Sequence, residues 1–595
     1  MTWAGLVVVI LKILVLFGFV MNMAAISVWA DRRQSAMVQD RVGPNRAVIY
    51  VPSNALRVVL FLMTAVVAGI IAIPMWQPAA GQGLARLTSG VEIAVLVGWF
   101  SLLLLSAHVR RNGADNAIDE VVASVEPRAY FYGGLAIHLA ALVAVRLVPA
   151  EILSASGIQW GTGLGGTLAA VVIMSAGFYA AAKLPDGKTA LRLAGTLHAI
   201  ADTLKSTWKE DLRPKQADKL LFEMAPILAM IPAMVTLAVI PFGSSLCFRD
   251  VDADGALSFV DLTALATTVD QSGICAAGHL TVPLQIADLN VGLLFVFAIA
   301  GTGIIGAAIA GWASDNKFAL LGGLRATSQM VSYEVALGLA IVGLLMICGS
   351  VHLQKIVDWQ GQNAWGIFAQ PVAFFLFFGA VVAETKRIPF DQPEGESELV
   401  AGYFVEYSGM KWLMFMVGEY VEFVFASALM VTLFFGGYHL PFLDNDGLRI
   451  AFGDAVVYEM KMTHFAVSAV RFVGFFGKVL LFWFAHVFVR WTLPRFRYDQ
   501  LMKLGWTKLL PLSLANILVT GLILLAIDGG GESVTAAMTF LADISQGVVA
   551  LIGLLAAVAF VTWLLEPSKR RRMVVSTSAR YADAAGGVKP SEMQA

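Results

Sequence analysis

The chain has 595 residues, of which 58% are hydrophobic and only 14% are charged, and its formal net charge is −1. Soluble domains carry about 25% charged residues, so this composition excludes a single soluble globule and predicts an all-α protein that crosses a membrane many times. The balanced net charge gives no reason to expect nucleic acid as a partner.

Thirteen apolar runs are long enough to be transmembrane helices. They cover residues 4–29, 58–75, 92–109, 130–148, 166–182, 222–242, 288–311, 333–349, 366–383, 412–435, 465–490, 511–527 and 546–565. The first run lacks the basic leader and small-residue cleavage site of a signal peptide, so it is interpreted as a membrane span.

Lysine and arginine are unevenly distributed between the two sets of loops. If the N-terminus lies outside, the inside segments are 30–57, 110–129, 183–221, 312–332, 384–411, 490–510 and the C-terminal tail. These segments hold 32 of the 41 lysines and arginines. Because cytoplasmic loops are enriched in these residues, we expect a periplasmic N-terminus and a cytoplasmic C-terminus in a bacterial inner membrane.

Five inside segments carry distinctive sequence. They are Gln39–Arg46 (QDRVGPNR), Ala201–Asp211 (ADTLKSTWKED), Ala310–Glu334, Ala383–Gly402 (AETKRIPFDQPEGESELVAG) and Leu493–Met502 (LPRFRYDQLM). In this order they resemble the quinone-site membrane subunit family of respiratory complex I, the H-type subunits of the NADH–quinone oxidoreductases. The resemblance covers residues 1–46 and 195–527.

Two regions depart from that family. Residues 47–194 interrupt the usual passage into the next segment and contain four of the predicted spans. The resemblance places both flanks on the cytoplasmic side, so an even number of extra helices is required. The expected organisation is a first helix and entrance loop (1–46), a four-helix insert (47–194), a core domain (195–527), an extra helix (528–567), and a basic, then disordered tail (568–595).

The inside segment 384–406 contains six carboxylates and only two cations, Lys386 and Arg387. The acids are Glu384, Asp391, Glu394, Glu396, Glu398 and Glu406. Crowded carboxylates in a partly dry site raise one another's pKa and titrate as a group. The resemblance implies that this loop lines the quinone tunnel and couples quinone reduction to proton translocation; the alternative is a solvated acidic loop. Arg387 and Asp391 are expected to form a local ion pair.

Three further acids fall within predicted spans or at their ends. Glu334 opens one span, and Glu419 and Glu422 share a face of another. A carboxylate inside a membrane is costly unless it is paired or protonated, so each is a candidate for proton coupling. The alternative is an inward acid satisfied by a neighbouring side chain, which is favoured most for Glu422.

Residues 197–208 form an amphipathic pattern typical of an interfacial helix. The resemblance implies that this helix borders the mouth of the quinone tunnel. The residues expected at the tunnel are Arg32, Arg41, Asp202, Lys205, Glu210 and Arg387. Arg495 and Arg497, with Asp499, indicate a docking surface for the peripheral arm, or plain inside charge.

The resemblance implies quinone as substrate and other complex I subunits as partners, in the peripheral arm and among the antiporter-like subunits. The chain has neither a GxGxxG motif at a strand–helix junction nor a ferredoxin-like cysteine run. We therefore expect it to bind no flavin or iron–sulfur cluster itself. Lipid surrounds its membrane spans.

The predicted outside loop 243–287 contains two of the three cysteines, Cys247 and Cys275. Because that compartment is oxidising, we expect them to form a disulfide. Between them, residues 250–261 match an EF-hand calcium loop, D-x-D-x-D-G with an acid at position twelve. The predicted ligands are Asp250, Asp252, Asp254, Ala256, Ser258 and Asp261. An Asp-rich turn without metal is the alternative.

Three other functions compete with the quinone enzyme. A homologous anchor of a membrane-bound hydrogenase or formate hydrogenlyase shares the fold, but the complete acidic loop favours the quinone enzyme. A secondary transporter would show inverted repeats with broken helices, which we do not find. The third alternative is a purely structural anchor.

Overall fold

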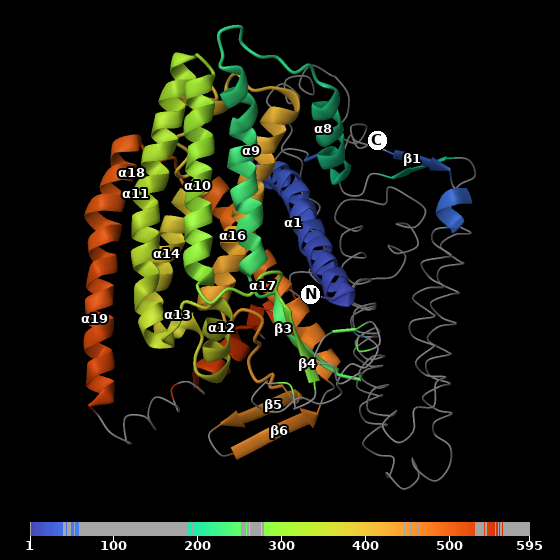
Figure 1. Ribbon diagram of the computed structural model, residues 1–595, viewed down its shortest axis with the longest axis vertical. Helices are drawn as coiled ribbons and strands as arrows, with labels where there is room; N and C mark the ends of the chain where they lie inside the picture. The colour runs from blue at the N-terminus through green and yellow to red at the C-terminus, as the bar shows by residue number, and fades with distance from the viewer. Residues whose placement is uncertain are drawn as a thin grey trace, which may run out of the picture. The chain divides into compact units, whose positions relative to one another are not determined.

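The structure is a computed structural model (Figure 1). It describes residues 2–39, 49–52, 54–58, 188–191, 195–251, 279–445, 447–452, 455–461, 464–529 and 544–553, with a few isolated positions between them. The chain divides into two units, residues 1–35 with 193–554 and residues 36–192 with 555–595.

Helices dominate the larger unit. They are α1 (Trp3–Val38), α8 (Leu197–Trp208), α9 (Lys219–Thr236), α10 (Gly292–Ala313), α11 (Lys317–Cys348), α12 (Leu353–Gln362), α13 (Gly366–Ala369), α14 (Pro371–Glu384), α15 (Glu396–Leu399), α16 (Gly409–Phe434), α17 (His464–Thr492), α18 (Tyr498–Leu504) and α19 (Leu510–Asp528). Shorter turns are the 3₁₀ helices η2 (Leu237–Val239) and η4 (Gly402–Phe404) and the π-helix η5 (Gly505–Leu509).

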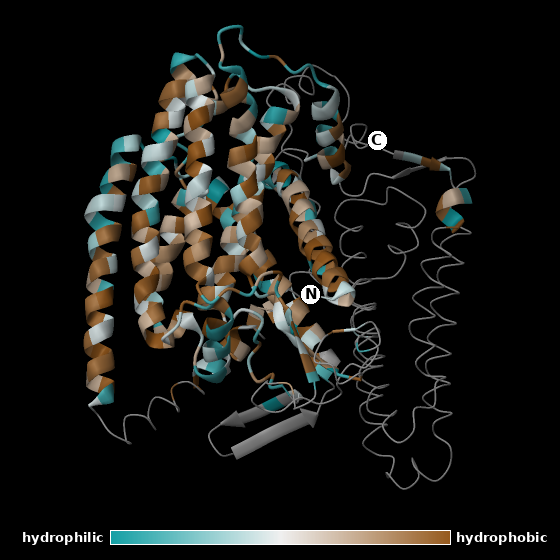
Figure 2. Ribbon diagram, in the orientation of Figure 1, coloured by the Kyte–Doolittle hydropathy of each residue, from teal (hydrophilic) through white to brown (hydrophobic). Residues whose placement is uncertain are grey.

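Within the described residues, seven helices are long and apolar enough to cross a membrane. Two shorter apolar helices, 371–384 and 544–553, coincide with two more of the predicted spans. The all-α, multi-pass class predicted from the sequence is confirmed. Figure 2 shows apolar residues along most of α10, α11 and α19 and polar residues gathered at the helix ends. The four spans predicted within the insert lie outside the described residues.

Helix α16 lies at the centre of the bundle. In its most apolar 18-residue stretch 72% of the residues are buried, against 17% for α1 and 11% for α19. Its side chains join the main apolar cluster with residues of α1, α9, α10, α11, α12, α14 and α17. A polar residue on α16 is therefore surrounded by protein rather than by lipid.

One helix begins well before the predicted span that it contains. The sequence predicted an inside segment at 312–332, but α11 begins at Lys317 and continues for 32 residues. The side chain of Asn316 accepts a hydrogen bond from the backbone N–H of Phe318 at 2.8 Å and caps the helix start. Gly349, with φ +63°, ends it in the left-handed region. The helix therefore includes residues 317–332, which the sequence had assigned to an inside segment.

Within the described residues, three short two-stranded sheets accompany the helices, and each is antiparallel. They pair β1 (Ile49–Pro52) with β2 (Lys188–Leu191), β3 (Gly243–Arg249) with β4 (His279–Leu284), and β5 (Gly447–Phe452) with β6 (Ala455–Lys461). In the first, which belongs to the smaller unit, Ile49 pairs with Leu191 and Pro52 with Lys188. The two ends of the insert therefore lie side by side, which agrees with an even number of crossings between them.

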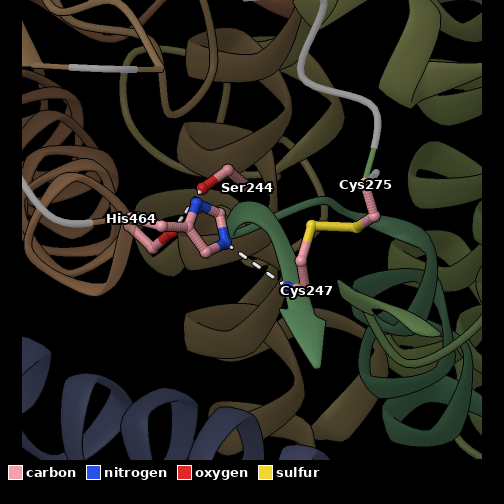
Figure 3. The surroundings of a disulfide bond; sticks show 5 residues. Ser244, Cys247, Cys275 and His464 are labelled. Atoms are coloured by element: carbon pink, nitrogen blue, oxygen red, sulfur yellow. Dashed lines mark hydrogen bonds between the residues drawn. A yellow bond between two sulfur atoms is a disulfide. The ribbon is translucent and has the colours of Figure 1, made fainter. Parts of the chain in front are cut away.

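The β3–β4 sheet contains one of the two cysteines of a disulfide (Figure 3). Cys247 of β3 and Cys275 are bonded, with Cα atoms 5.6 Å apart, as expected from the sequence. The imidazole of His464, at the start of α17, accepts a hydrogen bond from the backbone N–H of Cys247 at 3.4 Å. The sheets β3–β4 and β5–β6 lie with α12 at one end of the bundle, and α8 lies at the other end (Figure 1).

Close packing of α9 against α10 depends on the absence of a side chain at Gly306. A Cβ atom there would lie 2.5 Å from the backbone nitrogen of Ala229 and 2.8 Å from its Cα. Small residues at helix crossings let backbones approach in this way, and dispersion then holds the helices together. Since the obstructing atoms are backbone atoms, they cannot rotate away from a new methyl group.

We therefore predict that Gly306→Ala destabilises the chain by about 1–3 kcal/mol, the usual cost of overpacking. Thermal unfolding of the purified chain in detergent measures this. Gly338→Ala, on α11, is the matched control because a Cβ there meets nothing within 4 Å. Alanine is the better helix former, so the control should not lower the midpoint. Equal midpoints for the two variants would contradict the close-approach argument.

A second prediction concerns the three cysteines. With Cys247 and Cys275 bonded, Cys348 is the single free thiol. Denatured but unreduced protein should therefore incorporate one equivalent of maleimide, and reduced protein three. Closing this loop stabilises the fold by roughly 3–4 kcal/mol in the chain-entropy model, so reduction should also lower the thermal midpoint. Three equivalents without reduction would exclude the disulfide.

Candidate functional site

Two buried acids of α16 meet two consecutive cations of the loop that follows α14. Arg387 Nη2 lies 3.0 Å from Oε2 of Glu419, and the two side chains are 6% and 2% exposed. Lys386 Nζ lies 3.1 Å from Oε2 of Glu422. The acids are three residues apart on one helix face, so adjacent loop residues can reach both. Glu422 is thus an inward acid satisfied by a neighbouring lysine.

The charges of these acids keep the two loop cations ionised. Burial by itself would lower the pKa of Lys386, but the charges of Glu422 and Glu419 outweigh burial and raise it above its ordinary value. Burial likewise opposes the charge of Arg387, yet Glu419 raises the pKa of this guanidinium well above its usual range. Removing one partner of such a pair would leave an uncompensated buried charge.

The backbone of this loop enters the left-handed region several times. Lys386 has φ +55°, Val400 φ +66° and Gly402 φ +60°. A Cβ on Gly402 would lie 1.7 Å from the carbonyl oxygen of Pro393, so only glycine fits there. These turns fold the loop back over the end of α16 and bring its charged residues to the acids.

A small cavity lies beneath the loop, among α9, α10, α11, α14 and α16. Its volume is about 50 Å³, enough for a few water molecules. Its charged lining consists of Glu334, Glu384, Lys386 and Glu422, and the rest is mainly apolar. The sequence named Glu334 and Glu384 separately, and the structure brings them to the same cavity. Three carboxylates around a cavity of this size are suited to taking up and passing protons.

Two further loop acids, Asp391 and Glu394, lie near the Arg387–Glu419 pair. Asp391 Oδ2 is 2.7 Å from Nη2 of Arg495, and burial raises the pKa of Asp391 to about 6 although Arg495 opposes that rise. Burial, followed by the charges of Glu419 and Asp391, raises the pKa of Glu394 to about 8. The pKa values of these two acids therefore lie near neutral pH.

The prediction that Arg387 and Asp391 form an ion pair is wrong. Arg387 pairs with Glu419, and Asp391 pairs with Arg495. Asp391 follows Arg387 after only three intervening residues, but the turn between them sends their side chains to different partners. Arg495, expected on a docking surface, instead contributes to this site. Arg497 keeps a surface partner, Asp499, at 2.5 Å.

Two other loop acids, Glu398 and Glu406, do not line the cavity. Glu398 is exposed and pairs with Arg325 of α11 at 2.6 Å. Oε1 of Glu406 accepts a hydrogen bond from the side chain of Asn316. The side chain of Glu396 lies outside the described residues. The structure thus separates Glu384, Asp391 and Glu394 from an outer set that the sequence had grouped with them.

Two tyrosines extend the inner site. The hydroxyl of Tyr403 donates to Oε1 of Glu419 at 3.2 Å. The guanidinium of Arg387 lies 4.4 Å above the ring of Tyr420, whose hydroxyl donates to Oδ2 of Asp31 at 2.8 Å. Asp31 also pairs with Arg490 of α17. An ion pair, hydrogen bonds and stacking therefore connect Glu419 to the C-terminal part of α1.

The residues predicted at the quinone entrance form a looser group. Arg32 of α1 and Asp202 of α8 pair at 2.6 Å, and both are substantially exposed. Lys205 and Glu210 are exposed, while Arg41 lies outside the described residues. The segment after α8 docks on the start of α16 because Ser408 Oγ donates to the carbonyl of Glu210 at 3.1 Å. Lys411 of α16 pairs with Asp211 at 2.9 Å.

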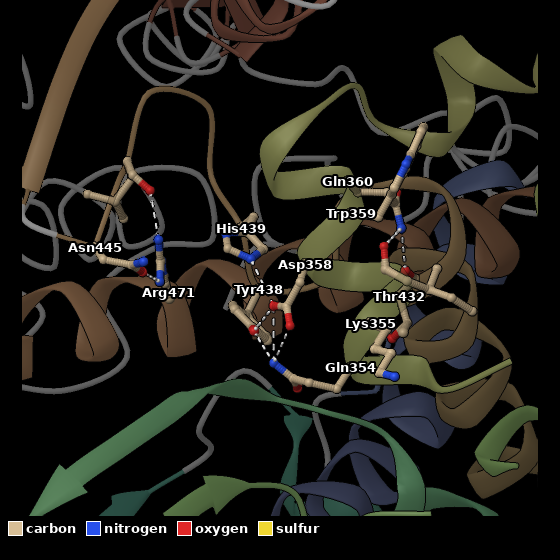
Figure 4. A network of polar contacts seen from close by, with 12 residues as sticks. Gln354, Lys355, Asp358, Trp359, Gln360, Thr432, Tyr438, His439, Asn445 and Arg471 are labelled. Carbon is tan, nitrogen blue, oxygen red and sulfur yellow. Dashed lines mark hydrogen bonds and ion pairs between the residues drawn. The ribbon is translucent and has the colours of Figure 1, made fainter. Parts of the chain in front are cut away.

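A separate polar cluster lies at the opposite end of α16 (Figure 4). The hydroxyl of Tyr438 donates to Asp358 of α12 at 2.9 Å, and His439 lies 3.6 Å from the same carboxylate. Burial lowers the pKa of His439 to about 4, so the ring is neutral at physiological pH. Lys478 of α17 donates to three backbone carbonyls beyond the end of α16, including that of Gly437 at 3.0 Å. This cluster fixes the far end of the helix.

Sequence reasoning missed several members of the inner site. It treated Lys386 only as a local counter-charge, although its position beside Arg387 and the three-residue spacing of Glu419 and Glu422 were available signals. It also missed Tyr403, Tyr420 and Arg490. Nothing local distinguishes these residues, because their contacts depend on segments distant in the chain.

The predicted calcium loop is only partly described. Asp252, Asp254 and Ala256 lie outside the described residues, and among those that are described no three acids, histidines or cysteines converge as a metal site. Asp261 accepts hydrogen bonds from the backbone N–H groups of Val251 and Ser258, each at 2.8 Å. These bonds close the loop between its second, ninth and twelfth positions. The calcium site stays a prediction.

If calcium binds this loop, millimolar calcium should raise the thermal midpoint of the purified chain relative to chelator, because a ligand specific to the folded state stabilises it. The response should disappear in Asp250→Asn. It should persist in Asp288→Asn, a control at the same end of the bundle, where Asp288 pairs with His352. An unchanged midpoint up to about 10 mM calcium, above the weak extracellular range, would exclude the site.

Known proteins share much of this sequence. A family profile described as NADH dehydrogenase matches residues 167–521. An H-type subunit of NADH-quinone oxidoreductase from Geobacter metallireducens is 43% identical over 331 residues, which are 56% of this chain and 84% of the relative. The corresponding protein of Cytophaga hutchinsonii is 39% identical with the same coverage. That of Flavobacterium psychrophilum is 40% identical over 335 residues, again 56% and 84%.

The matched residues include every charged residue that lines the cavity and both acids of α16. The profile covers more than half of the chain, and the alignments cover most of each relative. The relatives are subunits of an enzyme complex, and this chain has the membrane helices expected of such a subunit. The chain is a multi-pass membrane protein that belongs to the NADH dehydrogenase family, which includes the H-type subunits of NADH–quinone oxidoreductase.

Proposed function

We propose that this chain is the membrane subunit that forms the quinone cavity of a proton-pumping NADH–quinone oxidoreductase and couples quinone reduction to proton translocation. The observation that carries the proposal is the cavity lined by Glu334, Glu384, Lys386 and Glu422. It lies directly beneath the acidic loop, and it extends the charged path from the inside face toward the middle of the bundle.

Reduction of a quinone by two electrons takes up two protons, and this changes the charge beside any carboxylate that supplies them. Asp391 and Glu394 are suited to respond because their pKa values lie near neutrality, at about 6 and about 8. A change in the protonation of Asp391 or Glu394 would reach Glu419 and Glu422 through the same short loop, since Arg387 and Lys386 form ion pairs with those acids. The acids that line the cavity would then exchange protons with water that enters it.

Electrons would come from a peripheral-arm subunit, because the sequence carries no flavin or iron–sulfur motif of its own. The quinone would enter near Arg32, Asp202 and α8, where the amphipathic helix and the end of α1 meet. The charge change would pass to neighbouring antiporter-like subunits in the membrane arm. With the N-terminus in the periplasm, the orientation that the positive-inside rule predicts, the acidic loop would lie on the cytoplasmic side of a bacterial inner membrane.

We predict that Glu384→Gln leaves the complex assembled but lowers NADH-driven quinone reduction and proton pumping by roughly tenfold, as a barrier increase of about 1.4 kcal/mol would. Glutamine preserves shape but cannot exchange a proton. Glu398→Gln, the same substitution in the same loop, should have a smaller effect because Glu398 is exposed and pairs with Arg325.

Turnover and pumping should be measured in membranes or in purified complex, with subunit content checked by gel. Unchanged turnover and pumping in assembled Glu384→Gln complex would reject the proposed coupling role. If Glu398→Gln proved the more damaging variant, the outer acids rather than the cavity would carry the function.

A further inference from the structure

Gln329 of α11 occupies a position that neither the family motifs nor the proposed mechanism explains. Its side chain is fully buried. Nε2 donates one hydrogen bond to the carbonyl of Ala383 at 2.7 Å and another to the carbonyl of Phe390 at 2.8 Å. Both N–H groups of the amide are therefore used by one neighbouring loop.

These two carbonyls bracket the charged turn that follows α14. Ala383 precedes Glu384, and Phe390 follows Pro389, so Lys386 and Arg387 lie between the two contacts. Lys386 has φ +55°, a conformation that a residue with a side chain adopts only when its surroundings impose it. Gln329 supplies such a constraint from a different helix, at both ends of the turn.

We propose that Gln329 is a positioning residue: by clamping the turn at Ala383 and Phe390 it holds Lys386 against Glu422 and Arg387 against Glu419. The inference rests on the proposed coupling function. Gln329 is not in the cavity lining, so it acts through the turn rather than by exchanging protons.

The chemistry of the contact requires an amide. A carboxylate at this position would face two carbonyl oxygens without a proton to donate, and a thioether of similar size would donate nothing. Oε1 of Gln329 has no hydrogen-bond partner among the described residues, so the two bonds that Nε2 donates are the hydrogen bonds that hold this side chain. A buried polar group without its partners is unfavourable, which makes the site selective for glutamine.

The chain offers a matched control at the other end of α16. Gln360 is also buried, and its Nε2 donates to the carbonyl of Thr432 at 2.9 Å (Figure 4). Its Oε1 accepts hydrogen bonds from the N–H groups of Gly366 and Gly436 at 2.9 and 3.0 Å. It therefore clamps a loop in the same way but touches none of the cavity acids.

The test is a double-mutant cycle on the assembled complex, with NADH-driven quinone reduction as the readout. Gln329→Met should lower turnover roughly three- to tenfold, the range expected for one or two neutral hydrogen bonds. Gln329→Asn keeps the amide but reaches at most one carbonyl, so it should recover part of the loss. Gln360→Met should lower the thermal midpoint as much as Gln329→Met while turnover stays within about twofold.

In the Glu384→Gln background the effect of Gln329→Met should largely disappear, because both act on the same step. Independent, multiplicative losses would show a merely structural role and overturn the inference. Normal turnover in Gln329→Met beside a damaged Glu384→Gln would also overturn it, while leaving the proposed function standing. Normal turnover in Glu384→Gln would instead reject the proposed function itself. If Gln329→Met does not assemble, Gln329→Asn carries the same cycle.

Discussion

Two carboxylates inside a helical bundle are costly unless each is protonated or meets a cation, and this constraint governs the centre of the molecule. Glu419 and Glu422 lie on the most buried of the seven described membrane-length helices. Their partners come from a loop that must turn sharply to reach them, which explains the left-handed residues and Gly402. The early start of α11 and its buried Gln329 serve the same requirement from another side.

Much of the bundle could be predicted from the sequence because hydrophobic runs of membrane length leave few alternatives. The acidic loop was equally visible, since six carboxylates in one short segment are unusual in an apolar chain. The partners of those acids were not visible. Asp391 seemed matched to Arg387 by proximity in sequence, yet Arg495, about a hundred residues later, is the actual partner. Pairings across the chain depend on tertiary packing that no local pattern encodes.

The same limit applies to helix boundaries and to the outer acids. Hydropathy located the apolar half of α11 but not its polar half, because residues 317–332 are helical through capping and packing against the loop rather than through apolar content. Glu394 and Glu398 looked equivalent, four residues apart. The turn between them buries Glu394 near Glu419 and leaves Glu398 at the surface with Arg325.

The antiparallel pairing of β1 with β2 has a consequence for protein engineering. Pro52 and Lys188 are the last paired residues of its ladder, so the chain leaves and returns at neighbouring backbone positions. Antiparallel strands can be connected by a two-residue turn. Replacing residues 53–187 by Asn-Gly would therefore close the gap without stretching either strand, giving a shortened chain in which the contribution of the inserted segment can be assayed by subtraction. Segments can also be added at this junction: another pair of membrane helices could be grafted between Pro52 and Lys188.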